Sequence, residues 1–180
     1  HSRRYHAQPD CCPDCGPQVW LLDAEGRKIA GDVFAEAQKA LARGDILAVK
    51  GLGGIHLACD ARNAEAVRRL RRRKHREEKP LAVMCRDLNS ARSLCRVTEA
   101  EASLLESVRR SIVLLEKKAP EDFANLSDNR RLGVMLPYTP LHVLLLDGTS
   151  GGPDALVMTS ANLPGNPVLL ENEESAGALH

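Results

Sequence analysis

Aromatic residues, long apolar runs and disulfide-type cysteine spacing are all scarce in this chain. Phe, Trp and Tyr make up 3% of its 180 residues, so a hydrophobic core must be built from Leu, Val, Ile and Ala. The absence of any run of 18 apolar residues argues against a membrane-spanning helix, and the basic N-terminus carries no apolar signal core. The six cysteines lack the spacing of a disulfide framework. We therefore expect a cytoplasmic protein, because cytosolic thiols stay reduced.

The chain does contain enough aliphatic residues for a folded domain. Hydrophobic residues make up 43% of the sequence, which excludes a disordered chain. Residues 1–18 differ from the rest, since they hold three cysteines and three prolines without apolar periodicity. We interpret 1–18 as the tail of an upstream metal-binding module plus a linker, and 19–180 as one domain.

The hydrophobic pattern predicts strands that alternate with helices. Short aliphatic runs predict strands at residues 19–22, 45–50, 55–59, 81–85, 111–117, 132–136 and 155–160. Residues that favour the start of a helix precede four helical patterns, at Asp32, Asn63, Thr98 and Thr139. A further short helix is expected at 87–95, and the alternation argues for a layered α/β fold.

Two elements carry more specific expectations. In the helix after Asn63, the expected buried face is Ala64, Val67 and Leu70. His142 falls inside the helix that Thr139 and Pro140 open, where we interpret it as a hydrogen-bonded structural histidine rather than a catalytic base.

Two cysteines of the N-terminal segment have the spacing of zinc ligands. Cys12 and Cys15 form a CxxC pair, which is half of a tetrahedral site, and the other half would have to precede residue 1. The alternative is a pair of free thiols. The remaining thiols, Cys59, Cys85 and Cys95, fall in predicted strands or a helix and are expected to pack in the core.

Three segments carry residues that suit a phosphate group. Lys50 ends a strand and is followed by Gly53 and Gly54, where exposed backbone N–H groups could bind an anion; a tight turn is the alternative. Residues 68–79 hold eight Lys or Arg against two Glu, which suits a polyanion, although a solvated helix face explains part of this charge. The candidates at that helix end are Lys74, Arg76 and Lys79.

The third segment lies at the end of the last predicted strand. Thr159, Ser160 and Asn162 place short hydroxyl and amide groups there, which suit phosphate oxygens and metal-bound water. A strand-ending turn is the alternative. The whole set of candidates contains no evident nucleophile–base pair, so no catalytic residue is assigned.

Taken in order, these segments resemble a known family. Residues 50–61, 71–84, 133–142 and 159–167 look like the YrdC-like domain of the HypF-type hydrogenase-maturation carbamoyltransferases, and residues 3–17 are similar to the end of that family's second zinc finger. The resemblance implies a twisted mixed sheet with flanking helices and a basic concave groove. It also implies a domain that uses ATP with Mg²⁺ to convert carbamate, from carbamoyl phosphate, into carbamoyl-adenylate. The acceptor would be a HypE-type protein, and the full-length protein would hold zinc.

The resemblance assigns roles by position. Lys74 and Arg76 match the family's KxR phosphate-binding element, and Ser160 and Asn162 match its SxN element. Lys50 and the glycines after it match the loop of the same pocket, with His56 nearby. Pro164 stands where the family usually has Ser. The family's domain continues beyond the point that matches His180, so we expect 19–180 to be a C-terminally incomplete piece of a longer polypeptide.

Two alternative functions stay open from the sequence. A threonylcarbamoyl-AMP synthase of tRNA modification shares the domain and would activate carboxylated threonine; the loop at 51–59 and the CxxC tail favour the hydrogenase branch. A double-stranded RNA-binding module is compatible with the basic cluster, but the aromatic residues needed to stack single-stranded bases are missing.

Overall fold

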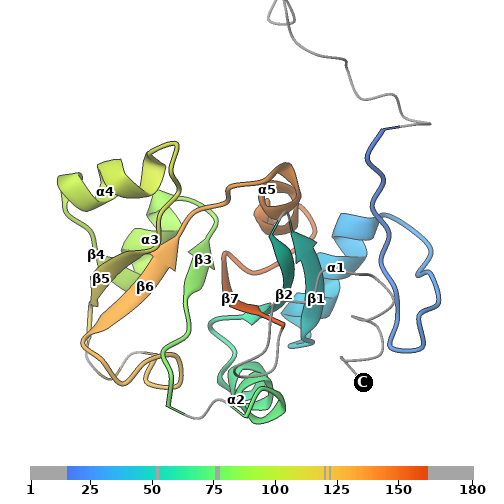
Figure 1. The fold of residues 1–180 in the computed structure, drawn as a ribbon, viewed down its shortest axis with the longest axis horizontal. Helices are drawn as coiled ribbons and strands as arrows, with labels where there is room; N and C mark the ends of the chain where they lie inside the picture. The colour runs from blue at the N-terminus through green and yellow to red at the C-terminus, as the bar shows by residue number, and fades with distance from the viewer. Residues whose placement is uncertain (1–15, 52, 76–77, 120, 122, 162–180) are drawn as a thin grey trace, which may run out of the picture.

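The computed structural model describes residues 16–51, 53–75, 78–119, 121 and 123–161 and shows one seven-stranded sheet with helices packed against it (Figure 1). The strands are β1 (Leu47–Gly51), β2 (Gly54–Asp60), β3 (Val83–Cys85), β4 (Cys95–Arg96), β5 (Val113–Lys117), β6 (Arg131–Met135) and β7 (Ala155–Ser160). The helices are α1 (Val33–Ala42), α2 (Ala64–Arg73), α3 (Leu88–Leu94), α4 (Glu99–Glu106) and α5 (Pro140–Leu146). Within these described ranges, every helix is too short or too polar to cross a lipid bilayer.

The strand order makes the sheet mixed and places the last strand near its middle. The order is β1-β2-β7-β3-β6-β5-β4, so β7 lies between β2 and β3. Among the strands of the described residues, β3 and β6 pair in parallel and the other neighbouring pairs are antiparallel. The predicted α/β fold with a mixed sheet and flanking helices is therefore confirmed.

The helices begin at the residues that the sequence indicated. The side chains of Asp32, Asn63 and Thr139 each accept a hydrogen bond from a backbone N–H in the first turn of α1, α2 and α5. Thr98 forms a full capping box with Glu101 at the start of α4. These caps depend on residues three positions apart, which is why the sequence alone locates them.

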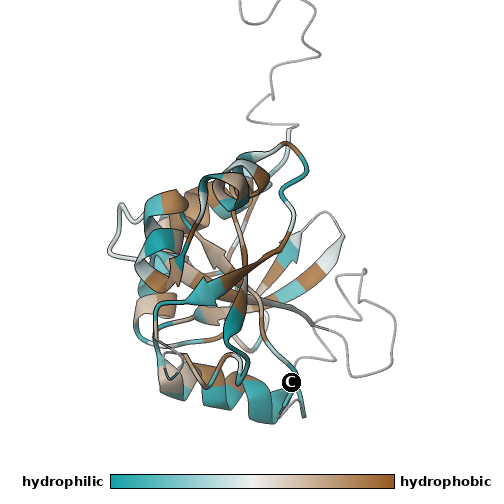
Figure 2. Cartoon of the chain, turned by 90° about the vertical axis from the view of Figure 1, so that its left-hand side faces the viewer, coloured by the Kyte–Doolittle hydropathy of each residue, from teal (hydrophilic) through white to brown (hydrophobic). Residues whose placement is uncertain are grey.

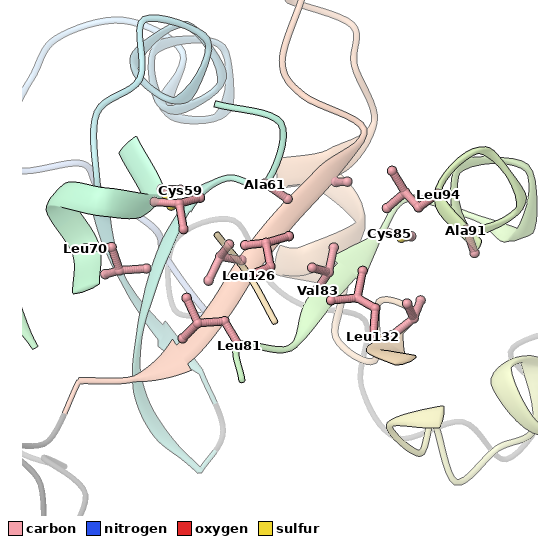
Figure 3. Close-up of a cluster of buried hydrophobic side chains, with 14 of the residues drawn as sticks. Cys59, Ala61, Leu70, Leu81, Val83, Cys85, Ala91, Leu94, Leu126 and Leu132 are labelled. Atoms are coloured by element: carbon pink, nitrogen blue, oxygen red, sulfur yellow. The ribbon is translucent and has the colours of Figure 1, made fainter. Parts of the chain in front are cut away.

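The two faces of the sheet are packed by different helices. Helices α2, α3 and α4 bury one face, which includes Leu57, Val83, Leu132 and Val157, and we call it the α2 face. Figure 3 shows part of this cluster. Helices α1 and α5 pack against Ala58, Met84, Met135 and Met158, on what we call the α5 face.

Two sequence predictions about local structure are wrong. Residues 19–22 form no strand. In the described part of the chain, their β-pairing is limited to a single bridge between Leu22 and Lys28. This apolar run has no neighbouring strand to pair with in the described sheet, which leaves Val19, Trp20 and Leu22 exposed. In α2 the buried alanine is Ala66 rather than Ala64, because Ala66 lies one turn before Leu70 on the same face.

Candidate functional site

An open groove lies on the α5 face, over β5 and β6. It has a volume of about 700 Å³ and is lined by Pro80, Leu114, Glu116, Asn129, Arg130, Arg131 and Gly133. Leu114 is 60% exposed, whereas Leu115 beside it is fully buried on the α2 face. The pairing of Leu114 with Gly133 and of Glu116 with Arg131 puts these residues on one face, which they share with Met135.

Three segments that are distant in sequence meet at one end of the sheet. Ser160, at the end of β7, pairs with His56 of β2, and His56 follows the turn at Gly53 and Gly54. Lys74, just after α2, donates a hydrogen bond from Nζ to the backbone carbonyl of Ser160. The candidate phosphate residues of the glycine turn, the α2 end and the β7 end therefore converge.

One edge of the open groove lies near this end of the sheet. The carbonyl of Ala82 accepts a hydrogen bond from the N–H of Met158, so the segment from Pro80 to Ala82 runs along the second half of β7. Pro80 also lines the groove. The groove therefore comes close to the end of β7 at Pro80, although most of its lining residues lie on or beside β5 and β6.

The converging side chains divide between the two faces of the sheet. Lys50 pairs with Ile55, and Thr159 pairs with Leu57, which places both on the α2 face. His56 and Ser160 alternate with these residues and lie on the α5 face. The sequence predicted one group of residues, but the strand register separates it into two sets that meet only at the strand ends.

Lys74 provides a buried cation at this point. Its side chain is only 6% exposed, and its backbone N–H closes the end of α2 by bonding to carbonyls of Leu70 and Arg72. His75 then adopts a φ of 47°, which turns the chain away from the helix axis. The cation is therefore fixed in place by a helix end on one side and a strand end on the other.

Most of the other basic residues of the cluster bind the protein itself. Arg68 and Arg72 contact Glu65, and Arg69 donates to the carbonyl of Gly44. Arg71 donates to the carbonyls of residues 79, 125 and 126, which joins α2 to the loop before β6. In Figure 2, α2 lies at the bottom and is largely hydrophilic on its outer surface. Much of this charge stabilises the fold, which the sequence did not reveal.

Two predicted residues and the predicted zinc ligands cannot be placed. Arg76, Asn162, Cys12 and Cys15 lie outside the described residues. Lys79 is described and exposed. In the ranges that the structure describes, no cluster of three or more His, Cys, Asp or Glu could hold a metal ion.

The core thiols behave as predicted. Cys59, Cys85 and Cys95 are free and buried. Burial raises the pKa of Cys59 and of Cys85 to about 12, and that of Cys95 to about 11. They therefore act as small apolar side chains.

A histidine pair on the α5 face was missed by the sequence analysis. His142 is 0% exposed, and neither of its ring nitrogens has a hydrogen-bond partner among the described residues. Burial, followed by the nearby charge of His56, lowers the pKa of His142 to about 4. The sequence analysis predicted a hydrogen-bonded structural histidine, but the described residues provide no hydrogen-bond partner for either ring nitrogen of His142.

His56 and Tyr138 complete the histidine cluster. Nδ1 of His56 is also buried without a partner among the described residues, and burial lowers the pKa of this imidazole. The ring of Tyr138 meets that of His142 edge to face, with centroids 4.4 Å apart. The sequence analysis named His56 and His142 separately, but nothing in the sequence indicated that they belong to one cluster.

Family models match both parts of the chain. The Sua5/YciO/YrdC model, which is described as telomere recombination, matches residues 39–180. A model described as the HypF finger matches residues 1–22. The domain boundary at residue 18 stays a prediction.

Similar proteins of known name are carbamoyltransferases. The chain is 50% identical over 176 residues to carbamoyltransferase HypF of Rhodobacter capsulatus, covering 97% of this chain and 23% of the relative. It is 48% identical over 174 residues to HypF2 of Cupriavidus necator, covering 88% of this chain and 22% of that protein. The chain thus spans less than a quarter of the length of these relatives.

Solved structures show similarity to the same proteins. A crystal structure of full-length HypF in a phosphate- and nucleotide-bound form matches with a TM-score of 0.86 at 43% identity, over 99% of this chain and 23% of that one. HypF of T. kodakarensis matches with a TM-score of 0.88 at 45% identity, over 97% of this chain and 23% of that one. Sua5 of P. abyssi, at 20% identity and a TM-score of 0.68 over 81% of this chain and 45% of that one, shares the fold. The chain belongs to the Sua5/YciO/YrdC family and is a homologue of the HypF carbamoyltransferases.

Proposed function

We propose that this chain is the domain of a HypF-type carbamoyltransferase that binds ATP and activates carbamate as carbamoyl-adenylate. The observation that carries the proposal is the convergence of Lys74, Ser160 and the glycine turn beside an open groove. A full-length HypF structure at 43% identity, of which this chain covers 23%, is described as phosphate- and nucleotide-bound, so a relative of this chain binds a nucleotide.

The proposed chemistry requires positioning rather than a protein base. A carbamate oxygen attacks the α-phosphorus of ATP, a new P–O bond forms, and the bond to the β-phosphate oxygen breaks as pyrophosphate leaves. Carbamate is already an anion, so no proton must be removed before attack. Repulsion between anions then dominates the barrier, and fixed cations and N–H donors lower it.

Each side chain has a distinct part in this scheme. Lys74, held against the end of β7, places a positive charge where the phosphates would lie. Exposed Lys50, at the end of β1, adds a second cation at this end of the sheet. Arg76 and Asn162 are assigned to the same site by their positions in the sequence. Mg²⁺ suits this site without a cluster of protein carboxylates, since it binds largely through phosphate oxygens and water.

Partners and location extend the same proposal. Carbamoyl phosphate would supply the carbamate, a HypE-type protein would accept the carbamoyl group, and Cys12 and Cys15 would bind zinc in the full-length protein. We place the protein in the cytoplasm, where ATP is available and thiols stay reduced.

Calorimetry of Mg·ATP binding tests the nucleotide site. Lys74→Met keeps the length of the buried side chain but removes the ammonium group, so we expect most of the binding heat to be lost. Lys50→Met, at an exposed position, should weaken binding without affecting folding. The matched control is Lys39→Met, because Lys39 lies in α1, is exposed and forms an ion pair with Glu36. Equal affinity in the Lys74→Met variant and the wild type would refute the proposed site.

A substrate comparison distinguishes the alternative enzyme. Threonine with bicarbonate should release pyrophosphate from ATP only if the chain is a threonylcarbamoyl-AMP synthase. Similarity to Sua5 at 20% identity shows the fold alone. The RNA-binding alternative loses much of its basis, because five of the basic residues at 68–79 donate to acceptors within the protein.

A further inference from the structure

Arg71 lies in the last turn of α2 and donates to three backbone carbonyls. Its Nε atom donates to the carbonyl of Asn125 at 2.7 Å, and its terminal nitrogens donate to the carbonyls of Leu126 and Lys79, each at 3.0 Å. A guanidinium group carries its N–H donors in one rigid plane, so it can hold several acceptors in a fixed geometry. An ammonium group on a flexible stem cannot do this. We call these three hydrogen bonds the Arg71 clamp.

The Arg71 clamp closes the chain segment that follows Lys74. The chain leaves α2 at His75, whose φ is 47°, and the carbonyl of Lys79 is then bound back to the same helix by Arg71. The start and the end of this short segment are therefore both attached to the last turn of α2. Lys74, which stands where the segment begins, is placed by both attachments.

The carbonyl of Leu126 connects the Arg71 clamp to the sheet. This carbonyl also accepts a hydrogen bond from the N–H of Leu81 at 2.9 Å. The side chains of Leu81 and Leu126 are buried in the cluster on the α2 face (Figure 3). One residue further along, the carbonyl of Ala82 accepts from the N–H of Met158 in β7. The clamp thus joins α2 to β7 through the chain that leads into β3.

Lys74 attaches the same helix end to β7 a second time. Its Nζ atom donates to the carbonyl of Ser160, at the end of that strand. With this contact alone, the end of α2 could pivot about the Lys74 side chain. The second attachment, through Arg71, removes that freedom. The place of the ammonium group relative to the end of β7 therefore depends on Arg71 as well as on Lys74 itself.

We infer that Arg71 is a positioning residue for the nucleotide site, because its clamp sets where the charge of Lys74 stands at the end of β7. This inference rests on the proposed function, in which Lys74 meets the phosphates of ATP. Arg71 acts through Lys74 and contributes geometry rather than charge. Geometry matters at such a site, since a displacement of about 1 Å caused by a distant substitution can cost about a hundredfold in rate.

Calorimetry of Mg·ATP binding to three variants tests the inference. Arg71→Met removes the clamp, and Mg·ATP should bind about tenfold more weakly or worse, the loss expected when one hydrogen bond to a charged group is misplaced. Arg71→Lys keeps the charge but cannot hold three carbonyls together, so its affinity should be closer to that of Arg71→Met than to that of the wild type. Arg72→Met is the matched control and should bind like the wild type, because Arg72 is exposed and pairs with Glu65 on the same helix.

Measurements on folded molecules separate positioning from stability. Each titration is made where circular dichroism shows the variant to be folded, so the affinity reports the geometry of the site. A residue that only stabilises the fold would lower the urea midpoint of unfolding and leave this affinity unchanged. Wild-type affinity in folded Arg71→Met, or in Arg71→Lys, would overturn the inference. Arg71→Lys decides alone if Arg71→Met does not fold.

Amide hydrogen exchange observes the Arg71 clamp without any nucleotide. The N–H of Leu81 shares the carbonyl of Leu126 with Arg71, so this amide should exchange faster in Arg71→Met and at the wild-type rate in Arg72→Met. An unchanged rate in Arg71→Met would show that Arg71 does not hold this junction, which also contradicts the inference.

The outcomes distinguish this inference from the proposed function. If the wild-type chain binds Mg·ATP and both Arg71 variants bind it equally well, the positioning role is refuted and the nucleotide site stands. If the wild-type chain does not bind Mg·ATP, the proposed function fails and the positioning role fails with it.

Discussion

At the scale of single residues, the buried histidines determine how the chain responds to acid. The pKa of His142 is about 4 in the folded chain, against an ordinary value of 6.5, so the unfolded chain binds this proton more readily. Stability is therefore lost as the pH falls below 6.5 toward 4. At pH 5 the loss from His142 should be about 2 kcal/mol relative to neutral pH.

Urea unfolding at pH 7.5 and pH 5 measures this loss as a difference between variants. Over that pH interval, the free energy of unfolding of His142→Leu should fall by about 2 kcal/mol less than that of the wild type. His75→Asn serves as the control, because His75 is exposed and asparagine tolerates its positive φ. Identical losses in the wild type and His142→Leu would mean that His142 titrates normally in the folded chain.

The core cysteines provide a second prediction at this scale. Because burial raises the pKa of Cys59 and Cys85 to about 12 and of Cys95 to about 11, almost none of these thiols is ionised at pH 8. We expect iodoacetamide to leave all three unmodified in the folded chain and to modify them after unfolding in urea. Peptide mass spectrometry reads each site separately, and rapid modification in the folded chain would contradict their burial.

At the scale of elements, the capping box of α4 offers a direct test. Thr98 Oγ1 accepts from the N–H of Glu101, and the Glu101 carboxylate accepts from the N–H of Thr98. Thr98→Ala removes the first of these bonds and should lower the free energy of unfolding by about 1 kcal/mol. Ser103→Ala, in the interior of the same helix, should change it by less than about 0.5 kcal/mol. Equal effects would show that the cap does not stabilise the helix.

The elements also show which features a sequence reveals. Asp32, Asn63, Thr98 and Thr139 were identified as caps because a cap depends on backbone groups two or three residues away. The segment 19–22 was wrongly predicted as a strand, since a strand requires a partner that the local pattern does not specify. The separation of Lys50 from His56 onto opposite faces follows from register, which becomes known only when the partner strand is known.

At the scale of the whole molecule, the candidate site depends on contacts that are distant in sequence. β7 is the last strand of the described chain, yet it pairs between β2 and β3, and only this insertion brings Ser160 to His56 and Lys74. The sequence identified Lys74 and Ser160 through resemblance to a family, but not their contact. The resemblance implied a basic concave groove, but the sequence did not show which residues line the observed groove or that His56 and His142 belong to one cluster, because both features are formed by segments that meet only in the assembled sheet.

This dependence predicts that nucleotide binding and folding are coupled. A site built from the ends of α2, β7 and the glycine turn exists only in the folded chain, so Mg·ATP should bind the folded state alone. At a concentration one hundred times its dissociation constant, it should raise the free energy of unfolding by about 2.7 kcal/mol. Urea unfolding followed by far-UV circular dichroism would measure the increase.

The variants make this coupling specific to the proposed site. Lys74→Met should lose most of the stabilisation at the same ATP concentration, because its binding is weaker, whereas Lys39→Met should keep all of it. Adenosine without phosphates should stabilise the chain much less than ATP, since the proposed contacts are to phosphate. Full stabilisation of Lys74→Met by Mg·ATP would place the nucleotide elsewhere on the molecule, away from the end of β7.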